Sequence, residues 1–268
     1  MARDVTDLEK IAERLDDAAR NAKSIAQLSR EMELSLEQAY EVQKRNVARR
    51  LKRGETRVGV KMGLTSRAKA LQMGVSDVLW GRLTGAMVVE DGGQLERARY
   101  IQPRVEPEVA FLLKSRLAGN VTPLQALAAV EAVAPAMEIV DSRYDNFKFS
   151  LTDVVADNAS AAGFVAGAWH NPALDMSNLG MLMSFNGRPV QVGSSAAILG
   201  HPLRSLVAAA RFAAQADEPL EPGWIVLAGG ATVAESLVAG SWVELEVQQL
   251  GRVAFSVTSS AAKLSLPA

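Results

Sequence analysis

The sequence predicts an α+β fold in which a helical N-terminal segment, residues 1–54, precedes a strand-rich catalytic body, residues 55–268. Two observations support this prediction. Apolar residues recur with a helical period through the first fifty residues, whereas after Gly54 they alternate or form short runs bounded by turn residues. Helical and strand patterns that occupy separate stretches of one chain indicate the α+β class.

Two helices are expected in the N-terminal segment. An apolar stripe runs through residues 8–15, where Leu, Ile, Ala and Leu recur at helical spacing. Thr6 and Glu9 have the spacing of a capping box, and so do Ser35 and Gln38, which predicts where each helix begins. The second helix ends in the basic run KRNVARRLKRG, which we interpret as a solvated helix face because it is short and lacks the interleaved aromatic residues of an RNA-binding surface.

The body is expected to consist mainly of strands, with three helices between them. Thr122 and Gln125 have capping-box spacing with proline at the first helical position, and Asn186-Gly187 between apolar stretches is a strong hairpin signal. Strands are predicted at residues 56–64, 105–114, 137–144 and 163–169, hairpins at 181–193 and 241–258, and helices at 66–74, 122–136 and 201–216.

Composition excludes several classes of protein. The chain has 268 residues, of which 29 are basic and 30 acidic, so the charge balance gives no reason to expect a nucleic-acid or membrane-surface binder. It contains no cysteine, which excludes disulfides, thiolate metal sites and cysteine nucleophiles. The N-terminus is too charged for a signal peptide, and no apolar run is long enough to span a bilayer, so a soluble cytoplasmic protein is expected.

The segment IQPRVEPEVAF, residues 101–111, places two acidic side chains on one face of a predicted strand. Successive side chains of a strand point to opposite faces, so the apolar side chains of Val105 and Val109 share one face. Glu106 and Glu108 therefore share the other face, where like charges lie side by side. This arrangement needs a physical reason, either solvent or a bound cation.

Glu138, in PAMEIVDSRY, would complete a cluster of three carboxylates. It follows a predicted helix that follows the strand of Glu106 and Glu108, and a strand–helix–strand unit can bring the second strand beside the first. Three partly buried carboxylates repel one another unless some are protonated or a cation neutralises them. Oxygen ligands without cysteine or a neighbouring histidine suit Mg²⁺ or Mn²⁺. The alternative is that the Glu-x-Glu pair lies on a solvated face, the commoner situation for such a pattern.

Lys61 is the candidate cationic residue of the site. In VGVKMG it shares a strand face with Gly59 and Gly63, which leaves room around its side chain. Glycine in a strand often marks close approach by a ligand or another backbone. A surface lysine beside a bulge is the alternative interpretation.

Asn158 and Ser160, in DNASAAGFVAG, lie just before an apolar strand and could orient a substrate carboxylate. Capping or turn formation is the alternative for both residues, because short polar side chains commonly have those roles. The Gly-rich segment LAGGATVAES is interpreted as a turn between strands, since it lacks the lysine and following helix of a nucleotide-binding loop.

Five segments together carry a resemblance to a known family. The segments VGVKMGLTS, RVEPEVAFLL, MEIVDSRYDNFKF, VVADNAS and LAGGAT occur in the order seen in the 2-keto-4-pentenoate hydratase and 4-oxalocrotonate decarboxylase group of the fumarylacetoacetate hydrolase superfamily. The resemblance covers nearly the whole chain. It implies a mixed β-sheet roll preceded by helices, with Mg²⁺ or Mn²⁺ held by Glu106, Glu108 and Glu138, and with Lys61 beside the substrate.

The resemblance also implies further site residues. Asp77, in GVSDVLWG, matches an acidic position near the family's site and is the candidate for proton relay, while Asn158, Ser160 and Thr232 are the candidates for substrate binding. The segment GRLTGAM gives Arg82 no assigned role. The hydrolase branch of the superfamily fits less well, because it uses a histidine to activate water and neither of the two histidines lies in such a motif.

Within the group, RVEPE and DSRYDNFKF are more similar to the decarboxylases than to the hydratases. The resemblance therefore implies decarboxylation of 2-oxo-3-hexenedioate to 2-hydroxypenta-2,4-dienoate, in meta-cleavage degradation of aromatic compounds. The alternatives are the hydratase of that dienoate and, more remotely, a non-catalytic partner of the hydratase. The resemblance further implies an oligomer and a complex with the cognate hydratase.

Overall fold

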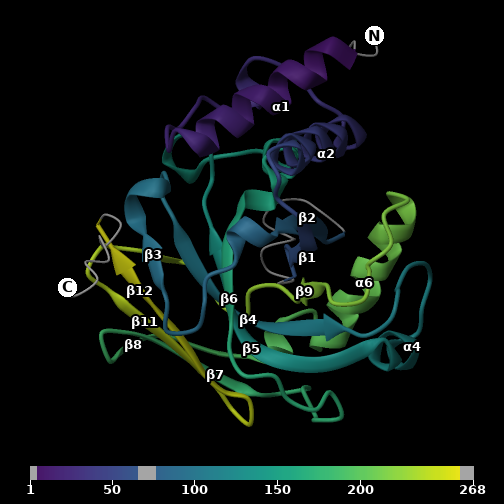
Figure 1. The fold of residues 1–268 in the computed structure, drawn as a ribbon, viewed down its shortest axis with the longest axis vertical. Helices are drawn as coiled ribbons and strands as arrows, with labels where there is room; N and C mark the ends of the chain where they lie inside the picture. The colour runs from purple at the N-terminus through teal and green to yellow at the C-terminus, as the bar shows by residue number, and fades with distance from the viewer. Residues whose placement is uncertain (1–4, 66–76, 260–268) are drawn as a thin grey trace, which may run out of the picture.

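The structure is a computed structural model that describes residues 5–65 and 77–259. It confirms the predicted α+β class, with mixed sheets and an N-terminal helical segment (Figure 1). The α-helices are α1 (Val5–Arg20), α2 (Leu36–Lys52), α4 (Pro123–Ala128), α5 (Leu151–Ala156) and α6 (Pro202–Gln215). Short 3₁₀ helices are η1 (Leu28–Arg30), η2 (Gly85–Met87), η3 (Arg97–Arg99), η4 (Asp145–Phe147), η5 (Asn158–Ser160) and η6 (Ser195–Ala197).

The strands form two sheets. The first sheet has seven strands in the order β2-β1-β9-β4-β5-β6, with β10 also paired to β4, and the second has five in the order β3-β12-β11-β7-β8. Each sheet is mixed, because β1 pairs in parallel with β9 and β12 pairs in parallel with β3. The strands are β1 (Arg57–Gly63), β2 (Leu79–Thr84), β3 (Gln94–Glu96), β4 (Arg104–Leu113), β5 (Val130–Val140), β6 (Ala161–Ala166), β7 (Gly180–Phe185), β8 (Arg188–Ser194), β9 (Ile225–Leu227), β10 (Glu235–Ser236), β11 (Trp242–Val247) and β12 (Gly251–Thr258).

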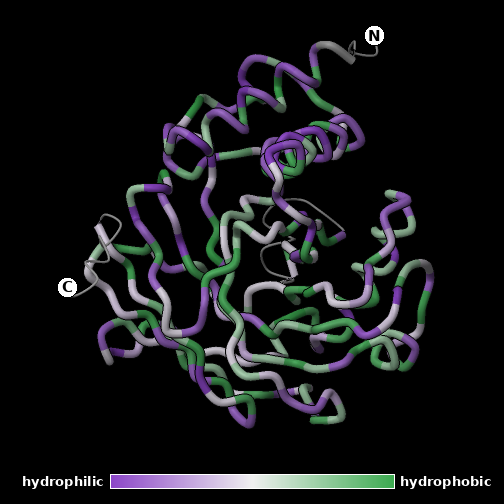
Figure 2. The backbone as a smooth tube through the Cα atoms, viewed as in Figure 1, coloured by the Kyte–Doolittle hydropathy of each residue, from purple (hydrophilic) through white to green (hydrophobic). Residues whose placement is uncertain are grey.

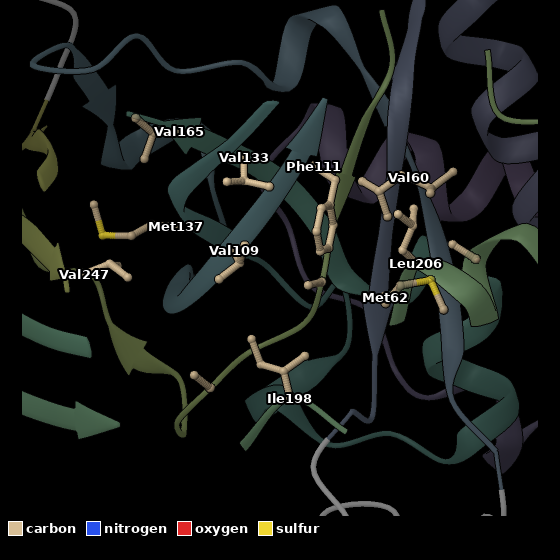
Figure 3. Packing of buried hydrophobic residues seen from close by; sticks show 14 of the residues in the cluster. Val60, Met62, Val109, Phe111, Val133, Met137, Val165, Ile198, Leu206 and Val247 are labelled. Carbon is tan, nitrogen blue, oxygen red and sulfur yellow. The ribbon is translucent and has the colours of Figure 1, made fainter. Parts of the chain in front are cut away.

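The main hydrophobic core lies on one face of the first sheet, where β11 and β12 pack against β5. Val109 and Phe111 of β4 point into this core together with Met137 of β5, and Val247 of β11 and Leu206 of α6 meet them (Figure 3). Burying these side chains is worth roughly 1.5–3 kcal/mol each. The opposite face of β4 and β5, which carries the acidic side chains, is therefore turned away from the second sheet.

The N-terminal helices form a second hydrophobic cluster with α5. Leu15 of α1 and Val42 of α2 are fully buried against Val155 of α5 and Tyr144. Hydrophilic residues predominate along α1 and α2, whereas the strands of the body are mainly hydrophobic (Figure 2). This packing against α5 holds α1 and α2 on the body of the protein. The domain boundary between residues 54 and 55 stays a prediction. None of the helices in the described part of the chain is both long and apolar enough to cross a membrane.

One of the two N-terminal capping boxes forms as predicted. The Ser35 hydroxyl accepts from the Gln38 backbone N–H, and the Gln38 side chain accepts from the Ser35 N–H. The expectation for Thr6 is wrong, because α1 already includes Val5 and Thr6. A capping residue lies outside the helix with a non-helical backbone, so a residue inside the first turn cannot have this role.

The helix predicted over residues 122–136 is also wrong in its second half. Its capping box at Thr122 forms, but the helix ends at Ala128 and β5 begins at Val130. Val133 faces the main core while Ala134 and Ala136 belong to a separate buried cluster on the other face of the sheet. A strand buried on both faces shows no polar alternation, so its sequence resembles a buried helix.

The remaining predicted elements within the described residues can be located in the structure, although the strands predicted to reach residues 144 and 169 end at Val140 and Ala166. The hairpin of β7 and β8 turns at Asn186 and Gly187, whose φ values of 52° and 75° are those of the tight turn that such a pair favours. The hairpin of β11 and β12 and the helix α6 lie where they were expected. The helix predicted over residues 66–74 lies outside the described residues.

Candidate active site

Three glutamates converge on the face of the first sheet opposite the main core. β4 and β5 pair antiparallel with Glu106 opposite Glu138, so the adjacency expected from the sequence is present. One carboxylate oxygen from each of Glu106, Glu108 and Glu138 lies within 4.8 Å of the others. Glu108 and Glu138 are 0% exposed and Glu106 is half-buried, so the Glu106–Glu108 pair does not lie on a solvated face.

Some carboxylate oxygens of the cluster are buried without a hydrogen-bond donor. The Gly229 N–H donates to Glu108 Oε2 at 2.7 Å, but Glu108 Oε1 and Glu138 Oε2 accept no hydrogen bond from the residues that the structure describes, and Glu138 Oε1 has only its ion pair with Lys61. Burial raises the pKa of Glu108 well above its usual range, and the charge of Glu138 raises it further. Burial also raises the pKa of Glu138, to about 7, although Lys61 opposes the rise. Ionised carboxylates in such a place need a compensating cation.

A hard divalent cation fits these residues. The ligands on offer are carboxylate oxygens, and no cysteine exists anywhere in the chain. Oxygen-only sites suit Mg²⁺ or Mn²⁺ rather than softer metals. The orphaned oxygens of Glu108 and Glu138 are the atoms that a cation would satisfy.

Lys61 lies beside the cluster and is buried. Its Nζ is 3.0 Å from Glu138 Oε1 and donates to the Ala159 carbonyl at 3.0 Å. The side chain is about 5% exposed, which excludes the surface-lysine interpretation. Burial alone would lower the pKa of Lys61, but the charges of Glu138 and Glu108 outweigh that effect and raise it. The lysine therefore holds a positive charge next to the carboxylates.

The glycines around Lys61 have different roles from the one expected. A Cβ at Gly59 would lie 1.9 Å from the Ile225 carbonyl oxygen, so this glycine permits close pairing of β1 with β9. The room for the lysine comes partly from Gly81 on β2, which pairs with Lys61 and whose Cβ would lie 3.2 Å from Lys61 Cδ. The sequence indicated space around the lysine but not which strand provides it.

A cavity of about 440 Å³ opens over this cluster. Lys61, Glu106 and Ser160 line it together with Arg104, Phe147 and Val154. Ser160 is 3% exposed, and its hydroxyl has no hydrogen-bond partner among the described residues. Asn158, Ala159 and Ser160 all have φ between 52° and 59°, a conformation that costs energy for alanine and serine and presents the Ala159 carbonyl to Lys61.

Three of the residues singled out in the sequence lie elsewhere. Both halves of the Asn158 amide bond to the backbone of Arg82, which corresponds to the structural alternative for that residue. Asp77 forms an ion pair with Arg211 at 2.7 Å and does not line the cavity. Thr232 donates to the Val233 carbonyl at 3.0 Å, and of these two residues only Val233 lines the cavity.

Sequence reasoning missed two features of the site. Arg104 lies two residues before Glu106 on the same strand face, so the alternation that found the glutamates could have found it. The glycines of LAGGAT support the carboxylates, because Gly229 donates to Glu108 and a Cβ at Gly230 would lie 2.3 Å from Glu106 Oε2. No local pattern indicates that a distant turn folds over a strand.

The chain was compared with protein families and known proteins. The fumarylacetoacetate (FAA) hydrolase C-terminal family model matches residues 56–258. A 4-oxalocrotonate decarboxylase of Pseudomonas sp is 60% identical over 94% of this chain and 98% of that protein. A 2-hydroxyhexa-2,4-dienoate hydratase of Comamonas testosteroni is 36% identical over 94% of this chain and 97% of that protein.

Two solved structures are similar to this one. A 4-oxalocrotonate decarboxylase from Pseudomonas putida G7, complexed with magnesium and adipate, superposes with a TM-score of 0.93 at 35% identity, covering 96% of this chain and 99% of that one. A fumarylpyruvate hydrolase from Pseudomonas aeruginosa reaches a TM-score of 0.60 at 16% identity, with coverage of 76% and 89%, and this likeness concerns the fold alone.

Proposed function

The chain belongs to the fumarylacetoacetate hydrolase family, and from this premise we propose that it is a metal-dependent carboxy-lyase that decarboxylates 2-oxo-3-hexenedioate, or 4-oxalocrotonate, to 2-hydroxypenta-2,4-dienoate. The observation that carries the proposal is the convergence of Glu106, Glu108 and Glu138 beside the buried ammonium of Lys61. The decarboxylase that is 60% identical over nearly the whole chain supports the choice of reaction. The reaction belongs to meta-cleavage degradation of aromatic compounds.

Glu106, Glu108 and Glu138 would hold Mg²⁺, or Mn²⁺ in its place. The similar decarboxylase structure contains magnesium. When bound, the ion supplies Lewis-acid chemistry for the 1-carboxylate and 2-keto oxygens of the substrate. The chain's contribution is to keep three oxygen ligands together in a place largely closed to water, where charge interactions are strong.

The substrate is a vinylogous β-keto acid. The C5–C6 bond breaks, CO₂ leaves, and the electron pair moves through the C=C bond to the 2-keto oxygen, which takes up one proton to give the dienol. Lys61 stabilises the negative charge that develops on that oxygen and can donate the proton, because its ammonium is already held at the carboxylate cluster. The Ser160 hydroxyl, which lacks a partner among the described residues, can donate to the substrate at the cavity wall.

The other residues suggested by the sequence have supporting parts in the proposal. Asn158 fixes the left-handed turn that presents Ala159 and Ser160. Thr232 belongs to the turn that covers the carboxylates, so its contact with substrate stays a proposal. Asp77 is proposed as a proton relay only if its ion pair with Arg211 opens, since that pair holds its carboxylate at α6.

The hydratase of 2-hydroxypenta-2,4-dienoate is the second candidate, because hydratases of the family are also similar over nearly the whole chain. Their identity of 36% against 60% for the decarboxylase favours decarboxylation. A purely non-catalytic partner of the hydratase is disfavoured, because a binding surface does not need three converging buried carboxylates.

One experiment tests the proposed function directly. Purified protein with Mg²⁺ is incubated separately with 2-oxo-3-hexenedioate and with 2-hydroxypenta-2,4-dienoate, and both CO₂ release and dienoate consumption are measured. We expect CO₂ release from the first substrate and little consumption of the second. Consumption of the dienoate without CO₂ release would instead identify a hydratase.

We also propose that the protein works in the cytoplasm as an oligomer, in complex with its cognate hydratase. A complex would pass the labile dienol directly from one enzyme to the next. Light scattering of the protein alone and mixed with the hydratase checks both parts, and a monomer in both samples would contradict them. Cell fractionation checks the compartment.

A further inference from the structure

We propose that Arg104 is the receptor for the distal carboxylate of the substrate and thereby selects 2-oxo dicarboxylates over 2-oxo monocarboxylates. The inference rests on the proposed function in taking a 2-oxo acid to bind at the glutamate cluster. It assigns to the cavity a second recognition element, separate from the carboxylates and from Lys61.

Arg104 occupies the right place along the cavity. It lies on β4, on the face that carries Glu106 and Glu108, and it lines the same cavity as Glu106 and Lys61. Residues two apart on a strand are separated by about 6.5–7 Å. The four carbon–carbon bonds between the keto carbon and the distal carboxylate of the substrate span about 5 Å. A substrate bound at the glutamates can therefore reach the guanidinium of Arg104.

The guanidinium of Arg104 is available for an anion. Other buried or partly buried arginines bond to oxygens of the protein: Arg82 to Glu218, Arg143 to Asp157, and Arg97 to three backbone carbonyls. Among the arginines that the structure describes, Arg104 alone is partly buried without a hydrogen bond or ion pair to an oxygen. An arginine offers five N–H donors in a fork that matches a carboxylate, so this one lacks the partner that its geometry suits.

Aromatic residues hold the guanidinium in position. Its Cζ lies 4.1 Å from the centre of the Phe147 ring, so the ring packs against the guanidinium of a side chain that lines the cavity. The Phe149 ring packs 5.7 Å from Phe147, and both phenylalanines line the cavity. Asn146 and Phe147 have φ values of 56° and 57°, a conformation that is unfavourable for a bulky residue. The chain thus keeps a strained turn that places an aromatic ring under Arg104.

The chemistry of decarboxylation predicts which kinetic constant depends on Arg104. The distal carboxylate is an anion in the bound substrate but leaves as neutral CO₂, so the ion pair stabilises the substrate complex more than the transition state. Removing an interaction of this kind raises KM and leaves kcat unchanged or higher. A residue needed only to keep the site folded would instead lower kcat.

Binding of two unreactive probes tests the proposal without turnover. 2-Oxoadipate has the distal carboxylate but lacks the C=C bond needed for decarboxylation, and 2-oxohexanoate lacks both. With saturating Mg²⁺, calorimetry of the wild-type protein is expected to show 2-oxoadipate binding about tenfold or more tightly, the size typical of a charged hydrogen-bonded pair. In Arg104→Gln this preference should fall below about threefold, while affinity for 2-oxohexanoate stays within about threefold.

Two further variants complete the test. Arg188→Gln, which removes an exposed arginine on β8, should leave both affinities unchanged. Arg104→Lys keeps the charge but not the planar fork, so it should retain only part of the preference. If Arg104→Gln fails to fold, as judged by thermal unfolding, Arg104→Lys decides alone, and an unchanged preference in that variant overturns the assignment.

The binding results test the role of Arg104 independently of whether the protein releases CO₂. An equal loss of affinity for both probes, or no preference in the wild-type protein, would show that Arg104 is not the distal receptor, whatever the CO₂ assay gives. A preference that depends on Arg104 supports the assignment even if no CO₂ is released, because it requires only that a 2-oxo dicarboxylate binds in this cavity.

Discussion

Two clusters in this molecule pair buried or partly buried glutamates with a buried cationic side chain and differ in whether the carboxylate oxygens are satisfied. In the first, Glu108 and Glu138 lie beside Lys61, and one oxygen of each carboxylate has neither a hydrogen bond nor an ion pair with the described residues. In the second, Arg82 binds Glu218 through two N–H groups at 2.9 and 2.8 Å. Lys61 of the first cluster lines the cavity of about 440 Å³ together with Glu106. Arg82 and Glu218 of the second cluster also border a cavity, of about 410 Å³, but they join secondary-structure elements.

The second cluster gives Arg82 the role that the sequence left unassigned. A third N–H of Arg82 donates to Gln43 of α2, whose own amide donates to the carbonyls of Trp80 and Val155. Glu218 follows α6, so the network connects α2, β2 and the end of α6. Carboxylates whose oxygens are all paired with protein groups hold a fold together, whereas buried carboxylate oxygens without a donor indicate a ligand site.

The largest effect is expected from breaking the incomplete cluster. Glu138→Gln removes one anionic ligand, so CO₂ release should fall by about 10³-fold or more, as expected for loss of several kcal/mol of Lewis-acid stabilisation. The fold should be kept, because the variant also removes like-charge repulsion. Steady-state kinetics, bound-metal analysis and thermal unfolding check these outcomes. Full activity of the native protein after EDTA treatment would refute the metal assignment.

A smaller loss is expected for Lys61→Ala, about 10²-fold in kcat, the size seen when one preorganised stabilising group is removed. Lys61→Arg should not restore the rate, because Gly81 leaves space for a slim chain and a compact ammonium. Mg²⁺ binding should persist, since Lys61 is not a ligand. Kinetics at saturating Mg²⁺ with a metal titration check this, and Lys44→Ala, at an exposed lysine, is the matched control.

A substitution in the Arg82–Glu218 cluster should change the stability of the protein and not its activity. Glu218→Gln is expected to lower the free energy of unfolding at pH 7 by about 1–3 kcal/mol, as for loss of charged hydrogen bonds. The rate of CO₂ release should stay within about twofold. Urea unfolding of both proteins, together with the standard assay, measures the two quantities. A large fall in kcat with unchanged stability would mean that the comparison between the clusters is wrong.

The stability difference between the wild-type protein and Glu218→Gln should depend on pH. Burial would raise the pKa of Glu218, but its hydrogen bonds to Arg82 and Arg57 outweigh burial and lower the pKa to about 2. A carboxyl whose pKa is lower in the folded state stabilises the protein above its unfolded pKa, near 4.5, and that stabilisation is lost as the pH falls towards 2. The stability difference between wild type and Glu218→Gln should therefore shrink from pH 4.5 downwards, as urea titrations at pH 7 and pH 3 would show.

The smallest effect is expected from removing the hydroxyl group of Ser160. Ser160→Ala removes a buried hydroxyl that has no partner among the described residues, so stability should be unchanged or slightly higher. If the hydroxyl binds substrate, KM should rise by about 3–10-fold, the range of one neutral hydrogen bond. Kinetics and thermal unfolding decide, and a clear loss of stability with normal KM would assign Ser160 to the turn alone.

The features that could be predicted from the sequence depend on interactions between residues close together in the chain. The capping box at Ser35 and the Asn186-Gly187 turn depend on residues within a few positions of one another, and both formed as predicted. The period-two geometry of a strand placed Glu106 and Glu108 on one face, where the like charges required either solvent or a bound cation. The order of predicted elements added Glu138 to this pair, and the glycines on its strand face singled out Lys61. The family resemblance then gave all four residues their expected roles.

Only the tertiary structure decided the rest, because strand pairing and satisfaction of polar groups depend on residues far apart in the chain. The sequence of residues 130–136 predicted a helix. In the structure these residues form the first part of β5, a largely buried strand that places Glu138 opposite Glu106. Asn158 proved to have both halves of its amide bonded to the backbone of Arg82, whereas the hydroxyl of Ser160 has no partner among the described residues. Whether a polar atom is already satisfied is a property of its neighbours in space, so the sequence could name polar candidates but not tell which of them remain available to a ligand.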